Sequence, residues 1–307
     1  MTTTLIDKIE ILNRCVWEHR LNKQDIDAWL NNFIGLTGDA TIEQSHALFL
    51  LSHYMYFGSK QIRQLIRAMF RDLYQYPVLA GIRKSHQDTT DLKLLKSEFY
   101  RHLISTRFLG LGNPSESGCH ILYYFRQMNG LPKELFVQAH ELLTLKDDES
   151  KDPLHFVFID DFLGSGETAL KAVAITQHLK YNHPRSKIDH YTLFACESGI
   201  NTVRSSGVFD RVESVIELDQ TFKCFAPDSR YFRNHSDPLA SDSVREMCAK
   251  YGMILQNGAE LGFGDCQLLI SFHHNTPDNT LPIFWSSSRS GFSWTPLFPR
   301  YPKLSYK

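Results

Sequence analysis

Residues 155–173 read HFVFIDDFLGSGETALKAV, and this stretch decides the fold of the chain. An apolar run at residues 155–159 predicts a buried strand that ends in two adjacent carboxylates, Asp160 and Asp161. A turn rich in small residues follows, and residues 166–180 have the composition of a helix. A strand, a turn and a helix in this order are typical of parallel α/β sheets, which bind ligands beyond the carboxyl ends of their strands.

The turn contains the residue types that surround a phosphate. Small residues let consecutive backbone N–H groups converge on an anion, and two hydroxyl side chains add donors. The adjacent carboxylates suit ribose hydroxyls, or a Mg²⁺ ion bridging them to a ligand, better than phosphate itself. The glycine spacing excludes a Walker A loop and a dinucleotide fingerprint. An ordinary capped strand–turn–helix connection fits the same residues without a ligand. The expected phosphate-binding residues are Gly164, Ser165, Gly166, Glu167 and Thr168.

The rest of the chain divides into two patterns. Up to residue 107, apolar side chains recur at spacings of three and four, which predicts a run of helices. After it, strand-like and helix-like segments alternate, and this alternation predicts a parallel sheet. We therefore expect an all-helical module over residues 1–107 and an α/β domain over residues 108–307. The aromatic- and proline-rich segment 292–307 is expected to dock on the body or on a partner.

A basic stripe is predicted on one helix of the N-terminal part. Residues 60–107 hold ten Lys and Arg against four Asp and Glu. A helix over residues 41–56, a short turn and a second helix over residues 60–76 resemble a helix-turn-helix. Contacts to nucleic-acid phosphates would be salt-sensitive, whereas a solvated surface explains the same stripe without any function. The side chains that share one helix face are Lys60, Arg63, Arg67 and Arg71.

Composition narrows the class of protein but not its partners. The 307 residues include 34 Asp and Glu against 33 Lys and Arg, so net charge favours no partner. Six scattered cysteines without a C-x-x-C pair fit neither a zinc site nor a disulfide framework. No apolar run reaches the ~20 residues that span a bilayer, and the N-terminus does not read as a signal peptide. We expect a reduced, cytoplasmic protein without a membrane partner.

Other residues are weaker candidates for the edge of the site. The loop FLGLGNPSESG at residues 108–118 precedes a helix, and it fits either a second anion loop or an ordinary capped helix entry. Two polar residues follow predicted strands, one after residue 196 and one after a strand through residue 272. The candidates are Ser115, Ser117, Gly118 and Arg126 for the second anion loop, and Glu197 and Asn275 for the site edge.

The spacing D-D-x-x-x-[ST]-G-x-T resembles the phosphoribosyl pyrophosphate (PRPP) motif of type I phosphoribosyltransferases. The resemblance implies that Asp160 and Asp161 contact ribose hydroxyls at a catalytic centre and that residues 164–168 hold the 5′-phosphate. It also implies a parallel-sheet fold of that type. Mg²⁺ with a PRPP-like ligand is consistent with the acids, and no metal is required by protein ligands alone. A convincing pyrophosphate loop and a basic catalytic loop are not evident in the sequence.

A closer resemblance covers roughly residues 108–286. The chain is similar to the PRTase-CE group of bacterial conflict systems, which includes ribosyltransferase and DNA-binding effectors encoded in type III retrons. The resemblance implies antiphage defence, with the retron reverse transcriptase and its RNA-linked DNA as partners. It rests on GLGNPSESG…YYFRQMN (110–129), FIDDFLGSGETA (158–169) and GFGDCQLLISFHHNTPDNTLPIFW (262–285).

Two functions of different class remain open on these grounds. One is an effector that acts on a ribosyl phosphate or nucleotide, as a (phospho)ribosyltransferase or a nucleotide N-glycosidase. The other is a non-enzymatic DNA-binding regulator that senses PRPP or a nucleotide. A nucleotide-salvage enzyme is disfavoured by the extra helical half. Fold analogy alone does not identify the reaction.

Overall fold

The chain divides into two compact units, and one of them is inserted into the other along the sequence. Met1–Ile62 and Asp219–Lys307 form the first unit, and Arg63–Leu218 form the second. This division differs from the boundary expected at residue 107, because the helices over residues 63–105 belong with the α/β sheet. The Tyr74 hydroxyl, for example, lies 2.6 Å from the hydroxyl of Thr106 in the first strand of that sheet. The computed structural model describes residues 2–111, 117–142, 153–233, 238–287 and 291–300.

The second unit contains a four-stranded parallel sheet with the order β2-β3-β4-β5. The two central strands are almost entirely buried, as expected for strands covered on both faces. The parallel α/β fold predicted from the alternating pattern is therefore confirmed. The strands are β2 (Thr106–Gly110), β3 (His155–Leu163), β4 (Lys187–Cys196) and β5 (Arg211–Leu218).

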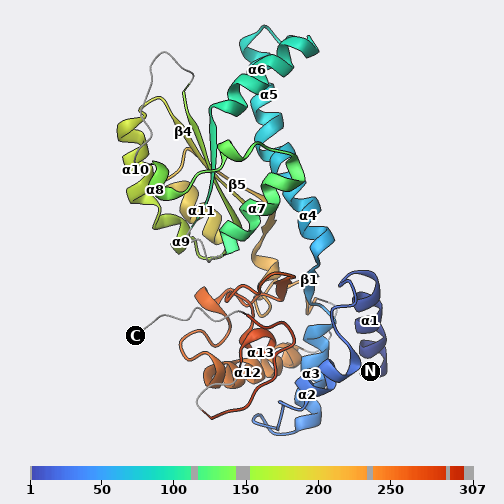
Figure 1. The fold of residues 1–307 in the computed structure, drawn as a ribbon. Helices are drawn as coiled ribbons and strands as arrows, with labels where there is room; N and C mark the ends of the chain where they lie inside the picture. Colours follow the sequence, from blue (N-terminus) through green and yellow to red (C-terminus); the bar gives the residue numbers. More distant parts are fainter. Residues whose placement is uncertain (1, 112–116, 143–152, 234–237, 288–290, 301–307) are drawn as a thin grey trace. The chain divides into compact units, whose positions relative to one another are not determined.

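Helices cover both faces of this sheet (Figure 1). On one face, Phe125 of α7 lies against Phe70 and Phe108, with ring centroids 5.8 and 5.2 Å away. On the other face, α9, α10 and α11 bury apolar side chains against Phe156 and Phe158. The helices after β2 are α7 (Ser117–Asn129), the 3₁₀ turn η2 (Lys133–Leu135), α8 (Ala139–Leu142), α9 (Glu167–Leu170), α10 (Val173–Asn182) and α11 (Glu197–Ser206).

The chain reverses its direction across the sheet at β2. After α7 it returns beside β2, where Phe136 forms a parallel bridge with Phe108, and it then crosses to β3 on the other side. Where consecutive connections run to opposite sides of a strand, the sheet has a topological switch point. Ligands of open α/β sheets bind at such a point, beyond the carboxyl ends of the strands. The loops that follow β2 and β3 both begin at this edge.

The predicted helix-turn-helix is not formed. Between its two expected helices the chain forms strand β1 (Met55–Phe57), which includes the end of the first expected helix and the first residue of the expected turn. This strand pairs in parallel with β6 (Ile270–Phe272). Pro77 was expected to end the second helix, but a π-helical segment precedes it and the helix continues through it. A proline is tolerated in the first turn after such a change of helix type. The helices before β2 are α3 (Ala40–Leu51), α4 (Ser59–Ala68), the π-helical η1 (Met69–Gln75), α5 (Tyr76–Ser85) and α6 (Leu92–Ile104).

The first unit is held together by an aromatic core built from both ends of the chain. Trp29 stacks on Phe284 with ring centroids 5.2 Å apart, and its indole N–H donates to the Ile283 carbonyl at 2.8 Å. Trp294 and Phe298 are also buried, so this part of the C-terminal segment docks on the body of its own unit. The other elements of this unit are α1 (Thr2–Cys15), α2 (Lys23–Leu30), η3 (Gln220–Phe222), α12 (Pro238–Leu255), η4 (Phe263–Asp265) and α13 (Pro282–Trp285).

The segment predicted as a further strand of the α/β sheet lies instead in this first unit. Residues 270–272 form β6, whose partner is β1 rather than any strand of the four-stranded sheet. The apolar run that suggested a core strand is buried in both arrangements, so burial alone does not identify its partner. Within the described residues, no helix is long and apolar enough to cross a membrane.

Glu43 is a fully buried acid in the first unit. Its carboxylate accepts hydrogen bonds from the Gly35 and Thr37 N–H groups, the Thr37 hydroxyl and the Tyr251 hydroxyl. Burial alone would raise the pKa of Glu43, but these donors offset it and the pKa lies below its ordinary value. The ionised carboxylate therefore holds the loop before α3 against α12.

We expect Glu43→Gln to lower the free energy of unfolding by about 2 kcal/mol at neutral pH, because a carboxylate acceptor is lost. All four tryptophans lie in the first unit, so denaturation followed by tryptophan fluorescence reports on that unit. A group with a depressed folded pKa stabilises above its unfolded pKa and loses that effect as the pH falls through the folded value. The difference from wild type should therefore shrink below the ordinary pKa of 4.5.

The exposed Glu10→Gln variant is the matched control and should unfold like wild type. A difference for Glu43→Gln that is constant, or grows, on acidification would contradict the assigned role of the ionised carboxylate.

Candidate active site

The two predicted catalytic acids lie inside β3 rather than after it. The strand extends to Leu163, beyond both Asp160 and Asp161. Asp160 is 9% exposed and Asp161 is 5% exposed, and the Asp161 N–H donates to the Asp160 Oδ1 at 3.0 Å. Aspartates are almost never fully buried unless they are paired, so two adjacent ones are uncommon inside an apolar strand. The acids therefore occupy the carboxyl edge of the sheet next to the switch point.

The regular pleat changes at the acids. Phe158 and Leu163 contribute to the same apolar cluster although their odd spacing would place them on opposite faces of a regular strand. Ladder pairing passes from Asp160↔Thr192 to Phe162↔Phe194 without including Asp161. Two neighbouring acids need such a change of alternation if both are to reach one ligand. Local distortions of this kind are common next to active sites, where they redirect side chains.

The neighbouring strands are distorted at the same level. Thr192 lies beside Asp160, and Ser214 of β5 pairs with Thr192. The Thr192 hydroxyl donates to the Phe194 carbonyl at 3.1 Å, and the Ser214 hydroxyl donates to the Ile216 carbonyl at 2.8 Å. Each hydroxyl bonds the backbone carbonyl two residues later in its own strand, next to the change of pleat in β3. Sequence reasoning missed both residues, although a hydroxyl inside an apolar strand was the available signal.

The loop after β3 is packed tightly against the first turns of α11. A Cβ atom on Gly199 would lie 1.8 Å from the Gly164 carbonyl oxygen, so only glycine fits there. Gly166 has a φ of +88°, and a Cβ on it would lie 2.8 Å from a methyl group of Val203. Gly166 is therefore required by its backbone conformation, and Gly199 by the close approach of the loop to α11. Gly199 is a supporting residue that the sequence motif did not include.

The rest of the loop is accessible to a ligand. Gly164 and Ser165 are half-buried, while Glu167 and Thr168 are exposed. The Ser165 hydroxyl accepts a hydrogen bond from the Glu167 N–H at 3.4 Å. The helix predicted over residues 166–180 is divided into α9 and α10, and α9 has only four residues. An anion held here would depend on N–H groups and hydroxyls of the loop itself rather than on a long helix dipole.

The other predicted site residues of the second unit lie at different places. Glu197 is the first residue of α11 and lies exposed directly after β4, at the same sheet edge. Arg126 lies in the last turn of α7, about 14 Å along that helix from its first residue. Ser115 lies outside the described residues, and Ser117 and Gly118 form the first turn of α7.

The strand before Asn275 is not part of the four-stranded sheet, which corrects the expectation that it ends beside the acids in the same sheet. Asn275 follows β6 in the first unit, whereas Asp160 and Asp161 lie in the sheet of the second. Its side chain follows a strand that pairs with β1, so the strand end predicted to meet the acids belongs to another sheet.

The residues of the basic stripe are exposed on α4 and η1. Lys60 and Arg67 are exposed, Arg63 lies over the Tyr124 ring at 5.5 Å, and Arg71 forms an ion pair with Asp72 at 2.7 Å. The boundary between the two units falls within α4, so the stripe is not a face of a single N-terminal module.

Metal binding would depend on the ligand as much as on the protein. Within the part of the chain that the structure describes, no group of three or more His, Cys, Asp or Glu could hold a metal ion. The carboxylates of Asp160 and Asp161 are the oxygen ligands that Mg²⁺ prefers, and Mg²⁺ usually takes further oxygens from substrate phosphates and water.

Comparisons with known proteins give a family match and a distant structural match. The PRTase-CE family model matches residues 26–300. Among solved structures, orotate phosphoribosyltransferase from Aeropyrum pernix is similar over 42% of this chain and 78% of its own, with 16% identity and a TM-score of 0.24. No curated protein matches the chain.

Gly199→Ala should disorganise the loop after β3, because its Cβ would overlap the Gly164 carbonyl oxygen. We expect a loss of about 2 kcal/mol or more in stability and faster amide hydrogen exchange over residues 160–170. Gly81→Ala is the control, since a Cβ there meets nothing within 4 Å inside a helix and should stabilise by up to about 1 kcal/mol. Unchanged exchange in the loop of Gly199→Ala would contradict the contact.

Proposed function

Because the chain belongs to the PRTase-CE family, we propose that the phosphoribosyltransferase-like unit binds a ribosyl phosphate compound at the carboxyl edge of its sheet and acts on it. One observation carries the proposal. Two adjacent acids, buried and at a change of pleat, immediately precede a glycine-rich loop at the switch point of the sheet. Asp160 and Asp161 would hold the ribose hydroxyls, and residues 164–168 would hold the 5′-phosphate.

The chemistry would take place at the anomeric carbon of the ribose. Carboxylate hydrogen bonds to the ribose hydroxyls and N–H groups around the phosphate fix the sugar at both ends, so binding energy positions the reacting carbon. Departure of the group on that carbon passes through an oxocarbenium-like state, and nearby carboxylates favour its positive charge. Transfer to an acceptor and hydrolysis share this step and differ in the attacking nucleophile.

A regulator that senses PRPP or a nucleotide without turnover is the second candidate. The observation that favours it is the position of Arg126 in the last turn of α7, about 14 Å along the helix from its first residue. Binding alone needs the acids and the loop but no cation near the leaving group.

We further propose that the protein is an effector of a retron antiphage system and contacts nucleic acid through its basic stripe. Support comes from the family and from the exposure of Lys60 and Arg67 on α4. The partners proposed on the same basis are the retron reverse transcriptase and its RNA-linked DNA. The contacts would be to backbone phosphates, since a stripe of cations without a helix-turn-helix has no recognition helix to place in a groove.

The Asp160→Asn/Asp161→Asn variant should bind PRPP at least tenfold more weakly than wild type in a calorimetric titration, because charge-assisted hydrogen bonds to the ribose hydroxyls are lost. Asp228→Asn/Asp242→Asn removes the same charge from exposed positions of the other unit and should bind like wild type. Phage protection should be lost in the first variant and kept in the second.

One outcome would contradict the assignment, and a second measurement separates the two candidate functions. Wild-type affinity of the acid variant for PRPP would remove the loop as a ligand site. Nucleotide profiles of cells expressing each variant separate the two candidates, since only an enzyme consumes or modifies a nucleotide in an acid-dependent way.

Arg63→Gln/Arg67→Gln should weaken binding to single-stranded DNA and reduce the slope of log affinity against log salt by about 1.4, as expected for two lost phosphate contacts. Lys93→Gln/Lys96→Gln removes the same charge from exposed positions on α6 and is the control. Equal slopes for the two variants would show that the stripe is only a solvated surface. The measurement is fluorescence anisotropy over a range of salt concentrations.

A further inference from the structure

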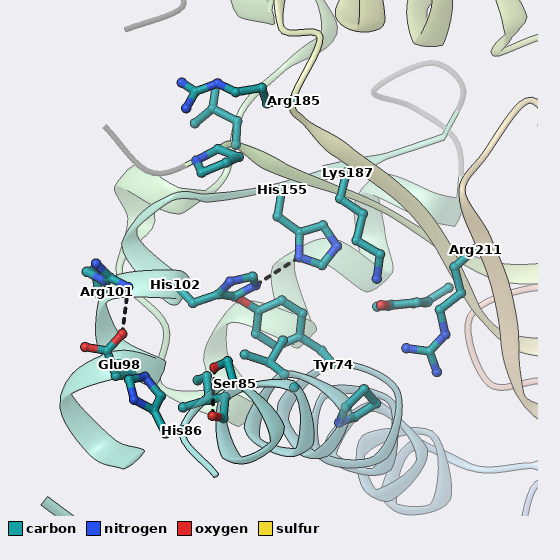
Figure 2. A pocket seen from close by; sticks show the side chains of 17 residues that line it. Tyr74, Ser85, His86, Glu98, Arg101, His102, His155, Arg185, Lys187 and Arg211 are labelled. Carbon is teal, nitrogen blue, oxygen red and sulfur yellow. Dashed lines mark hydrogen bonds and ion pairs between the residues drawn. The ribbon is translucent and has the colours of Figure 1, made fainter. Parts of the chain in front are cut away.

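A cavity opens at the edge of the four-stranded sheet opposite to the candidate active site. It has a volume of about 430 Å³ and lies where the strands begin (Figure 2). Its lining includes His155, Lys187 and Arg211, which are the first residues of β3, β4 and β5. The predicted acids lie at the other end of β3, so this cavity is separate from the candidate active site.

The cavity has an excess of positive charge. Four cations line it against one lining carboxylate, Glu98, and the buried Asp189 paired with Lys187 brings the local formal charge to +2 with the histidines neutral. Cations gathered around a partly enclosed volume attract a polyanion, and guanidinium groups match phosphate oxygens in geometry. The four cations are Arg101, Arg185, Lys187 and Arg211.

Protein contacts hold several of these cations in place at the rim. Arg101 donates to Glu98 at 2.7 Å and remains 60% exposed. Arg211 donates to the Leu73 carbonyl at 3.1 Å and lies over the Tyr191 ring at 5.6 Å. Arg211 also forms an ion pair with Glu213 at 3.2 Å, and its bonds to Leu73 and Glu213 use two of the five N–H donors of a guanidinium. The rim is therefore partly preorganised.

The floor of the cavity is a buried hydrogen-bonded network. The Asp189 carboxylate, fully buried, accepts from the His155 ring at 3.0 Å, the Lys187 ammonium at 2.9 Å and the Tyr191 hydroxyl at 2.5 Å. Burial alone would raise the pKa of Asp189, but its hydrogen bonds and the neighbouring cations hold that pKa below its ordinary value. The His155 ring also lies 3.2 Å from the His102 ring, nitrogen to nitrogen.

Flat and apolar surfaces complete the lining. The Tyr74 and His155 rings are stacked with centroids 5.6 Å apart, and Figure 2 shows them between the cations of the two sides. Pro77, Val78 and Ile82 add aliphatic surface from α5. Tyr74 and His155 are at most 2% exposed, so the accessible apolar surface is that of α5. A simple inorganic anion would use the cations but not this surface, whereas a nucleobase would use both.

We propose that this cavity binds a nucleoside monophosphate, with its phosphate on the rim cations and its base against the aliphatic surface of α5. The cavity is large enough for one small ligand, and it combines rim cations with this half-buried aliphatic surface above a buried polar floor. The proposal does not depend on the function of the loop after β3, because the two sites share no residue.

The test titrates the full chain with 5′-AMP and, separately, with inorganic phosphate by calorimetry. The titrations use the Asp160→Asn/Asp161→Asn background, so that binding at the loop after β3 does not contribute. Arg101→Gln/Arg185→Gln removes two exposed rim cations outside the buried network, and Lys93→Gln/Lys96→Gln removes the same charge from α6 outside the cavity. Arg101→Lys/Arg185→Lys keeps the charge.

The rim variant should bind AMP about tenfold or more weakly, while the α6 variant stays within about twofold and the lysine variant recovers most of the affinity. Phosphate should bind more weakly than AMP in every protein that retains the rim. Equal affinity for AMP and phosphate would overturn the nucleotide assignment. The absence of AMP binding, or an equal loss in the rim and α6 variants, would overturn the site.

Discussion

Strand β3 hydrogen-bonds in parallel to β2 on one side and β4 on the other, and most of the second unit depends on this pairing. A buried parallel strand has apolar side chains on both faces along its length, so polar groups are tolerated mainly at its ends. In β3 these are His155 at the start and Asp160 and Asp161 near the finish. Each end brings polar groups to one edge of the sheet, and helices close both faces between them.

The carboxyl edge shows how a site is built where regular structure is interrupted. The pleat of β3 changes at Asp161. At the same level, the Thr192 and Ser214 hydroxyls bond backbone carbonyls of their own strands, β4 and β5. Gly199 then allows the next helix to approach the loop to within van der Waals contact. Each of these irregularities in β3, β4, β5 and the loop is accompanied by a hydrogen bond or a close contact nearby.

Much of the second unit could be predicted from the sequence, because its strands are continuous apolar runs followed by turn residues. The acid pair and the loop are contiguous in the chain, so one motif indicated both. The boundary expected at residue 107 differs from the division of the structure because helical periodicity does not show whether a helix packs with the sheet that follows it, as residues 63–105 do. The strand before Asn275 was assigned to the wrong sheet because an apolar strand such as β6 does not indicate which strand it pairs with. The network around Asp189 joins residues distant in sequence, and no local pattern indicates it.

The discontinuous first unit has a consequence for synthesis on the ribosome. The indole N–H of Trp29 bonds to a carbonyl 254 residues later in the chain, and its stacking partner Phe284 is made at nearly the same time. At roughly 5–20 residues per second, the emerging N-terminal segment waits on the order of tens of seconds for these partners. The inserted unit, Arg63–Leu218, leaves the ribosome completely in that interval. The order of folding is therefore expected to run from the middle of the chain outward, with the exposed aromatic side chains of the N-terminal segment depending on chaperones until translation ends.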